Sequence, residues 1–453
     1  MSAILTTAGN EGPGADTAAR AGAVAVATRR LMPFLILMYM IAFLDRSNVG
    51  LAKQGLQADA GVGDAMFALG AGIFFVGYAI FEVPSNLVMH RFGTRVWMAR
   101  IMVTWGIVSA CTMFVTGGTS FLVIRLLLGL AEAGFFPGII LFLTHWFPAR
   151  ERARVLGLFY FGYPLALTIG NPLSGALLTL DGLGGLRGWQ WMFLVEGLLA
   201  VVVGLLTLRI LPERPAEVGW LAPEQKRALG EALEAEAAAK AGAGHVGLGA
   251  SFRSPRLMHL VALYFLMQIG SYGVVFYLPQ QVSDLMGVKI GLAVGVVSAL
   301  PWLCAVAVTA FWPALAQRLH RPRLFLIICL LATAAGLAIS AVAPATAAVA
   351  ALCLAASGII SVQAIFWSFP TARFGGVAAA GAIALINAIG NLGGFVAPNI
   401  RSWADRSWHS PAAGLYAISL ATIVAVALAL FLPARGFGAA AAPASGSEGA
   451  SRV

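Results

Sequence analysis

Residues 31–52 read LMPFLILMYMIAFLDRSNVGLA, and this stretch decides the fold. A helix needs about 20 mostly apolar residues to cross the hydrocarbon core of a membrane, and the stretch supplies them. It also carries an acid and a base side by side, Asp45 and Arg46. The stretch therefore predicts a transmembrane helix with two charged side chains inside it.

The composition of the whole chain agrees with this interpretation. Of its 453 residues, 60% are hydrophobic and only 11% are charged, and the mean hydropathy is +0.86. A soluble domain carries about 25% charged residues, so the composition excludes a soluble multidomain enzyme and a largely disordered chain. We expect an all-α polytopic membrane protein with twelve transmembrane helices, at roughly 31–52, 66–89, 97–116, 120–144, 153–178, 189–211, 257–283, 290–316, 323–343, 346–369, 376–400 and 412–432.

The Lys and Arg residues gather on one side of these spans. With both termini in the cytoplasm, 22 of the 29 lie in cytoplasmic segments and five lie outside. Because positive charge favours cytoplasmic loops, we expect both termini inside, in a plasma (inner) membrane. The chain then divides into a cytoplasmic tail (1–30), a six-helix bundle (31–211), a long cytoplasmic loop (212–256), a second six-helix bundle (257–432) and a small, polar cytoplasmic tail (433–453).

The charge and the cysteines point to no cofactor. The net charge of +10 follows from the cytoplasmic loops, so it implies no nucleic acid partner. The four cysteines lie in apolar runs without metal-ligand spacing, and the sequence has no phosphate-binding loop and no nucleophile triad. In the long loop, Pro223 to Lys240 predicts a surface helix. We therefore expect neither an enzyme nor a metalloprotein.

Ionisable residues inside the spans mark the candidate site. Each costs about 2.5–3.5 kcal/mol at a helix centre, so such residues face a bundle interior or a water-filled cavity. All of them lie in the first half of the chain: Asp45, Arg46, Glu82, Arg125, Glu132 and Glu196. Glu82 and Glu196, near span ends, are more simply explained as braces of helix packing.

Arg125 and Glu132 are seven residues apart on one predicted helix. They share a face but lie about 10 Å apart, so each needs a partner on another helix. Asp45 and Arg46 supply these partners in a four-member cluster. An arginine fork suits carboxylate recognition, and a buried carboxyl beside an arginine suits proton coupling. A purely structural ion-pair network is the alternative.

Polar residues at helical spacing continue the candidate site in the second half. Tyr264, Gln268 and Tyr272 form one stripe, and Asn387 and Asn391 form another. Of these, Tyr272 and Asn391 are the preferred substrate contacts, and the others are possible cavity-lining residues. Polar contacts between helices are the alternative explanation. Trp367 and Ser368, at the end of a span, are further possible lining residues, and Arg91 and Arg95 are positive-inside loop residues with a possible gating role.

Several motifs together resemble the major facilitator superfamily, and more closely its anion:cation symporter family. They cover the chain from about residue 30 to 432. The matching segments are FLDRSN (43–48), GY (77–78), PSNL (84–87), RFGTR (91–95), RLLLGLAEAG (125–134), LPERP (211–215) and ALINAIGNLGG (384–394).

The resemblance implies proton-driven uptake of organic anions such as tartrate, phthalate, hydroxyphenylacetate or sugar acids by alternating access. It implies that Asp45 and Glu132 carry protons, that Arg46 and Arg125 coordinate the substrate or these acids, and that Tyr78 and Asn391 help line the cavity. Tyr163 stands where sugar-acid members have a polar amide, which favours smaller or more apolar carboxylates. His90 and Gln317 replace the superfamily's loop acids, so the usual gate salt bridge is in doubt.

We therefore expect a monomeric, proton-coupled importer of a small organic carboxylate, with membrane lipid as its surroundings and the proton as its coupling ion. An anion uniporter or exchanger is one alternative. A transporter-like membrane sensor that signals through the 212–256 loop is another.

Overall fold

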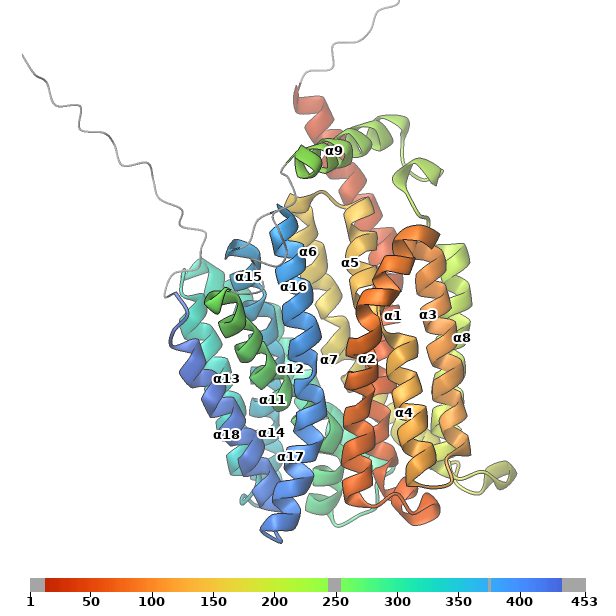
Figure 1. Ribbon diagram of the computed structural model, residues 1–453, viewed down its shortest axis with the longest axis vertical. Coiled ribbons are helices and arrows are strands. Elements are labelled where there is room, and N and C mark those ends of the chain that lie inside the picture. The colour runs from red at the N-terminus through yellow and green to blue at the C-terminus, as the bar shows by residue number, and fades with distance from the viewer. Residues whose placement is uncertain (1–12, 243–253, 374–375, 434–453) are drawn as a thin grey trace, which may run out of the picture.

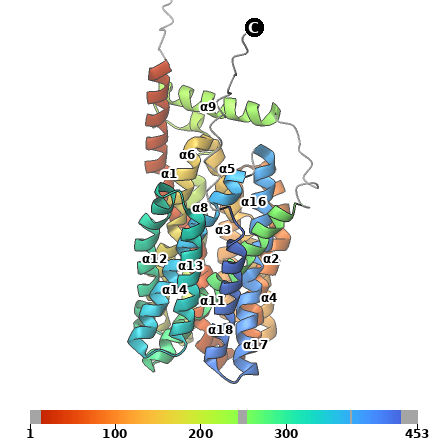
Figure 2. The ribbon, with the colours of Figure 1, turned by 90° about the vertical axis from the view of Figure 1, so that its left-hand side faces the viewer.

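The computed structural model describes residues 13–242, 254–373 and 376–433, and every regular element within these ranges is a helix (Figure 1). This described part contains 12 helical segments long and apolar enough to cross a membrane, which confirms the predicted number. The segments run side by side, and α9 lies across their axis at the end where α1 begins (Figure 2). We call this the α9 end of the bundle.

The first six spans are built from eight helices that pack as one half. They are α1 (Pro13–Ala60), α2 (Asp64–Phe92), α3 (Thr94–Ala110), α4 (Gly118–Glu132), α5 (Phe135–Trp146), α6 (Ala149–Tyr160), α7 (Gly162–Leu178) and α8 (Gly188–Ile210).

The surface helix expected in the long loop is α9 (Pro223–Gly242), which packs on α1 and α5 of the first half. The second half consists of α11 (Pro255–Met286), α12 (Leu292–Arg318), α13 (Pro322–Ser340), α14 (Ala345–Phe366), α15 (Ser368–Arg373), α16 (Gly376–Asn391), α17 (Gly393–Ser407) and α18 (Pro411–Ala429). Of the expected C-terminal tail, residues 434–453 lie outside the described ranges.

Helix α1 begins well before the expected span boundary at residue 31. Its alanine-rich beginning is a strong helix-forming sequence, and Ala23 and Ala27 are fully buried. Part of the segment expected to be an N-terminal tail is therefore the first turns of the first helix, which continue out of the membrane region to meet α9.

Four of the spans are broken into two helices, which hydropathy did not predict. The break in the fourth span follows Glu132 directly: Ala133 leaves helical geometry and Gly134 adopts φ +91°, a left-handed conformation that favours glycine. The break places Glu132 at the last position of α4. The other breaks lie at Phe161, Trp367 and Leu392.

Close contact between α2 and α4 positions the charged residues of the first half. A Cβ atom on Gly129 would lie 2.0 Å from the carbonyl oxygen of Phe74, and one on Gly77 would lie 2.6 Å from that of Leu126. Only glycine allows two backbones to approach so closely.

Glycines also close the two halves against each other at the end opposite α9. A Cβ on Gly295 of α12 would lie 2.3 Å from the carbonyl oxygen of Asn171 on α7, and one on Gly175 would lie 2.7 Å from that of Gly291. Helix α2 packs on α17 toward the same end. The halves are therefore in intimate backbone contact at this end of the bundle.

A carboxylate outside the membrane region caps α3. Glu213, just beyond α8, accepts hydrogen bonds from the backbone N–H groups of Thr94 at 2.8 Å and Arg95 at 2.9 Å. Partial burial opposes the charged form of Glu213, but the bonds from Arg95 and Thr94 outweigh it and lower the pKa of this carboxyl. A depressed pKa means that Glu213 stabilises the fold above the unfolded pKa of about 4.3, and that this contribution is lost as the pH falls through the folded pKa.

We expect Glu213→Ala to lower the free energy of unfolding by about 1 kcal/mol at neutral pH, the usual cost of losing a helix cap. The difference from the parent protein should shrink in acid, where the carboxyl is protonated in both states. Thermal unfolding in detergent at neutral and acidic pH measures both effects. The control is Glu234→Ala, which removes an exposed carboxylate from α9. If Glu213→Ala lowered the free energy of unfolding as much in acid as at neutral pH, the role of the Glu213 carboxylate as a cap of α3 would be contradicted.

Candidate functional site

One close ion pair lies at the centre of the bundle. Arg46 Nη2 on α1 is 2.5 Å from Glu132 Oε1 at the end of α4, and the Glu132 side chain is fully buried. This agrees with the expectation that Glu132 takes its partner from the first span. A carboxylate and a guanidinium buried together hold each other charged, because either alone would be costly in this environment.

Aromatic rings and the opposite half surround Arg46. Its guanidinium lies 5.2 Å from the ring centres of Phe43 and Tyr78 and 5.5 Å from that of Phe74. Its Nη1 is 3.5 Å from the hydroxyl of Tyr272 on α11, in the second half. Arg46 therefore contacts both halves, and any change in their relative position changes its surroundings.

Arg125 and Asp45 form a second pair that is less close than the pair of Arg46 and Glu132. The expected four-member cluster therefore consists of one close pair and one looser pair. Asp45 accepts a hydrogen bond from Ser109 Oγ, and Arg125 lies near enough to interact with it electrostatically. Arg125 is buried, and its Nε donates to the carbonyl oxygen of Gly70 at 3.3 Å. Within the described chain its two Nη atoms have no hydrogen-bond partner, so this fork is available to an acceptor.

The two remaining intramembrane carboxyls are bound by neutral groups. Glu196 accepts hydrogen bonds from Asn48 at 2.8 Å and from Ser174 at 2.6 Å, which ties α8 to α1 and α7. Glu82 accepts one from Asn387 of α16 at 2.9 Å, across the two halves. These three bonds suit the expected bracing of helix packing, and the bond to Glu82 also joins the halves.

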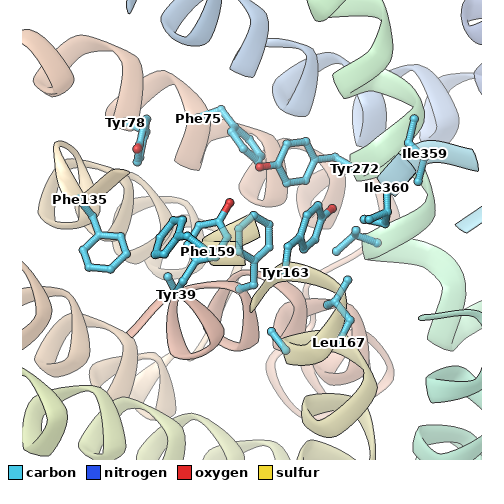
Figure 3. Packing of buried hydrophobic residues seen from close by; sticks show 14 of the residues in the cluster. Tyr39, Phe75, Tyr78, Phe135, Phe159, Tyr163, Leu167, Tyr272, Ile359 and Ile360 are labelled. Atoms are coloured by element: carbon cyan, nitrogen blue, oxygen red, sulfur yellow. The ribbon is translucent and has the colours of Figure 1, made fainter. Parts of the chain in front are cut away.

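A small cavity lies beside the central ion pair, between the two halves. Its free volume of about 40 Å³ holds a few water molecules at about 10–15 Å³ each. Six tyrosines and three phenylalanines contribute to its wall, and Figure 3 shows several of these rings converging from different helices. The lining residues are Tyr39, Ala42, Phe43, Arg46, Tyr78, Phe135, Phe136, Tyr160, Tyr163, Tyr264, Gln268, Ser271, Tyr272, Gln363, Asn387 and Asn391.

An amide network forms the wall of the cavity in the second half. Gln268 Nε2 donates to Asn391 Oδ1 at 2.9 Å, and Gln363 Nε2 donates to Gln268 Oε1 at 3.0 Å. The network continues to Ser271, whose hydroxyl accepts a hydrogen bond from Gln363 Nε2 at 3.4 Å and lies 3.0 Å from the hydroxyl of Tyr163 in the first half. The cavity therefore has a cation on one side, neutral donors and acceptors on the other, and aromatic faces between them.

Comparison with known proteins shows the family of this chain. The family model of the Major Facilitator Superfamily matches residues 35–398. The chain belongs to the Major Facilitator Superfamily. It is 42% identical to the inner membrane transport protein RhmT of Escherichia coli, over 87% of this chain and 91% of that protein. It is 43% identical to a candidate tartrate transporter of Agrobacterium vitis, over 89% of this chain and 93% of that protein.

Solved structures of the Major Facilitator Superfamily share the fold. The D-xylose–proton symporter aligns with a TM-score of 0.71 at 15% identity, over 89% of this chain and 98% of the other. Together with the family match, this confirms the predicted major facilitator fold and shows a membrane transporter rather than an enzyme.

In this Major Facilitator Superfamily protein, most of the predicted site residues meet at one place. Tyr78, Tyr264, Gln268, Tyr272, Asn387 and Asn391 line the cavity with Arg46. Asp45, Arg125 and Glu132 lie behind this wall in the first half. Their roles as proton carriers or substrate contacts stay predictions.

Trp367 and Ser368 do not contribute to the cavity wall in the described structure, contrary to the expectation that they line it. They lie at the break between α14 and α15. There Trp367 packs on Tyr264 with ring centres 5.0 Å apart, and Ser368 Oγ donates to the carbonyl oxygen of Ile365. Trp367 therefore supports a lining residue from behind.

Several lining residues were not among the sequence candidates, notably Tyr39, Tyr160, Ser271 and Gln363. Tyr39 had a detectable signal, because residues 39, 42, 43 and 46 share one helical face. The predicted gating arginines lie far from the cavity: Arg91 is exposed, and Arg95 is partly buried at the start of α3. A gating role for them stays a prediction.

Proposed function

We propose that this protein is a proton-coupled importer of a small organic carboxylate. The observation that carries the proposal is the ion pair between Arg46 and Glu132, buried at the wall of the central cavity and in contact with Tyr272 of the other half. A carboxylate substrate is chemically equivalent to the Glu132 side chain, so the two compete for the same guanidinium.

This competition couples the substrate to a proton. When the substrate carboxylate takes the place of Glu132 on Arg46, the freed Glu132 is left buried without a counter-ion, and it binds a proton to become neutral. One anion and one proton enter together, and the charge of the site is unchanged. Arg125 and Asp45 offer a second, similar exchange for a dicarboxylate.

The cavity wall supports a substrate that is small and partly apolar. Nine aromatic rings contribute to it, and Tyr163 stacks on Phe43 with ring centres 3.8 Å apart. The similarity to a candidate tartrate transporter supports the carboxylate group as the recognised feature. Metal ions and organic cofactors have no part in this mechanism.

The orientation in the membrane follows from the loop charges. The α9 end carries most of the Lys and Arg residues, so it faces the cytoplasm of a bacterial inner membrane. The opposite end, where the halves are in backbone contact, then faces outward. In this conformation the outer route to the cavity is closed by packed helices.

Uptake into proteoliposomes tests the proposal. We expect an inward proton gradient to stimulate uptake of radiolabelled tartrate or benzoate, and a protonophore to abolish the stimulation. Unstimulated but saturable exchange would instead indicate a uniporter or exchanger. Tight binding without flux would indicate a sensor. Neither outcome is compatible with proton-driven import.

A further inference from the structure

A second cavity lies between the halves at the end opposite α9. Its volume is about 460 Å³, within the range of small-molecule sites at about 300–1,000 Å³, whereas the free volume of the central cavity is about 40 Å³. The first half contributes the end of α1 and the beginning of α2, and the second half contributes α11, α17 and the start of α18. Its main polar groups are Lys53, Gln54, Asp64, Tyr277, Arg401 and Asp405.

Arg401 is the unusual member of this cavity. Its residue is only 5% exposed, and its guanidinium lies 4.2 Å from the ring centre of Tyr277, stacked as in a cation–π contact. Its Nε is 3.7 Å from Asp405 Oδ2, too far for a hydrogen bond, and has no hydrogen-bond partner in the described chain. The Tyr277 ring thus fixes the plane of the buried Arg401 guanidinium, and the N–H donors of this guanidinium are not all hydrogen-bonded.

The other charged groups of this cavity are already bound. Lys53 pairs with Asp64 at 2.8 Å. Asp405 accepts the backbone N–H of Gly414 at 2.8 Å, and Asp284 accepts Gln280 Nε2 at 2.7 Å. Arg406 Nε donates to the carbonyl oxygen of Ser402 at 3.1 Å. The acids of the cavity therefore have donors of their own, and the Nε of Arg401 makes no hydrogen bond to them.

The position of this cavity relates it to the central site. Lys53 and Arg46 are seven residues apart on α1, so they lie about two helical turns, or 10 Å, apart along the bundle. Tyr277 and Tyr272 are likewise neighbours on α11. Helices α1 and α11 pack together between the central cavity and the Arg401 cavity. A ligand bound at Arg401 therefore lies on the outer side of the packed helices that close the route to the central cavity.

We propose that the Arg401 cavity is a second, outer binding site for a small organic carboxylate, where the anion is held before the halves open. The ligand class rests on the proposed function, although the site itself does not. The carboxylate accepts hydrogen bonds from the Arg401 fork, and Tyr277 fixes the plane of that fork. Arg401 is therefore a binding residue of the entry step and has no part in proton coupling.

Equilibrium binding of tartrate to purified protein tests the site directly. The variant Arg46→Ala/Arg125→Ala removes both central arginines, and we expect it to retain one weak tartrate site. Adding Arg401→Gln should remove this residual binding. Adding Arg187→Gln should not, because Arg187 is an exposed arginine at the same end that pairs with Asp59 and lies outside the cavity. Absence of residual binding in the double variant would overturn the proposal.

Transport assays can compare substrate added outside with substrate loaded inside. A purely structural role of Arg401 would not affect the two directions differently. In the otherwise unchanged protein, Arg401→Gln should raise KM for external substrate about tenfold, equivalent to about 1.4 kcal/mol. The KM for efflux of internal substrate should stay the same. Arg401→Lys, which keeps the charge and the fold, should give an intermediate external KM. Equal changes on both sides would overturn the outer site, and intact proton-driven uptake in that case would leave the central mechanism standing.

Discussion

Glu132→Gln is expected to abolish proton-driven accumulation of substrate while leaving exchange intact. The amide has the size of the carboxyl and can still accept a hydrogen bond from Arg46, so the site keeps its shape. The amide cannot take up a proton when the substrate displaces it from Arg46, so the step that couples substrate binding to proton binding is lost. Accumulation under an inward proton gradient and counterflow without a gradient measure the two properties in the same vesicles.

A second buried carboxyl of the same half provides the matched control. Glu196 is 1% exposed and Glu132 is fully buried, but the hydrogen-bond partners of Glu196, Asn48 and Ser174, are neutral. Glu196→Gln keeps an acceptor oxygen there, and we expect it to accumulate substrate like the parent protein. Full accumulation by Glu132→Gln would remove Glu132 from the coupling step. Loss in both variants would show that any buried carboxyl of this half is required, and the specific exchange at Arg46 would be wrong.

The location of the central site was predictable because charge inside a membrane is costly. The spacing of Arg125 and Glu132 indicated that each takes a partner from another helix, and the charged pair of the first span, which includes Arg46, supplied the candidates. The residues of the cavity wall were harder to predict from the sequence. A tyrosine or a glutamine costs little free energy inside a membrane span, so its presence there does not indicate a site. Gln363 and Tyr160 were missed for this reason.

The breaks within the transmembrane spans could not be predicted from hydropathy. The segment from Gly118 to Trp146 is strongly apolar on average despite Arg125 and Glu132, so hydropathy predicts one helix there. The break at Gly134 depends on a backbone conformation that leaves no trace in hydropathy. The same limit explains Trp367, whose side chain is directed by the break between α14 and α15 rather than by the period of one continuous helix.

The glycine contacts between the halves lead to the second large effect. We expect Gly295→Val to abolish net uptake, because its Cβ would lie 2.3 Å from the carbonyl oxygen of Asn171 and would push α12 away from α7. The halves could then not close at the outer end, and the protein would stay open to the outside. Substrate would still bind, because the central residues are unchanged. Gly175→Val, acting on the same interface through the carbonyl oxygen of Gly291, should have the same effect.

Labelling of a cysteine at the cavity wall measures this state. In a variant without the native cysteines, Ala42→Cys places a thiol in the central cavity, and a membrane-impermeant reagent applied from outside should label it faster when Gly295→Val is added. Gly157→Val is the matched control, because Gly157 is an exposed helical glycine whose Cβ would meet no atom within 4 Å. Normal uptake by Gly295→Val, or faster labelling with Gly157→Val as well, would contradict closure by these contacts. The expected pattern follows from backbone distances alone, so it tests the alternating closure of the halves independently of the substrate and of the proton.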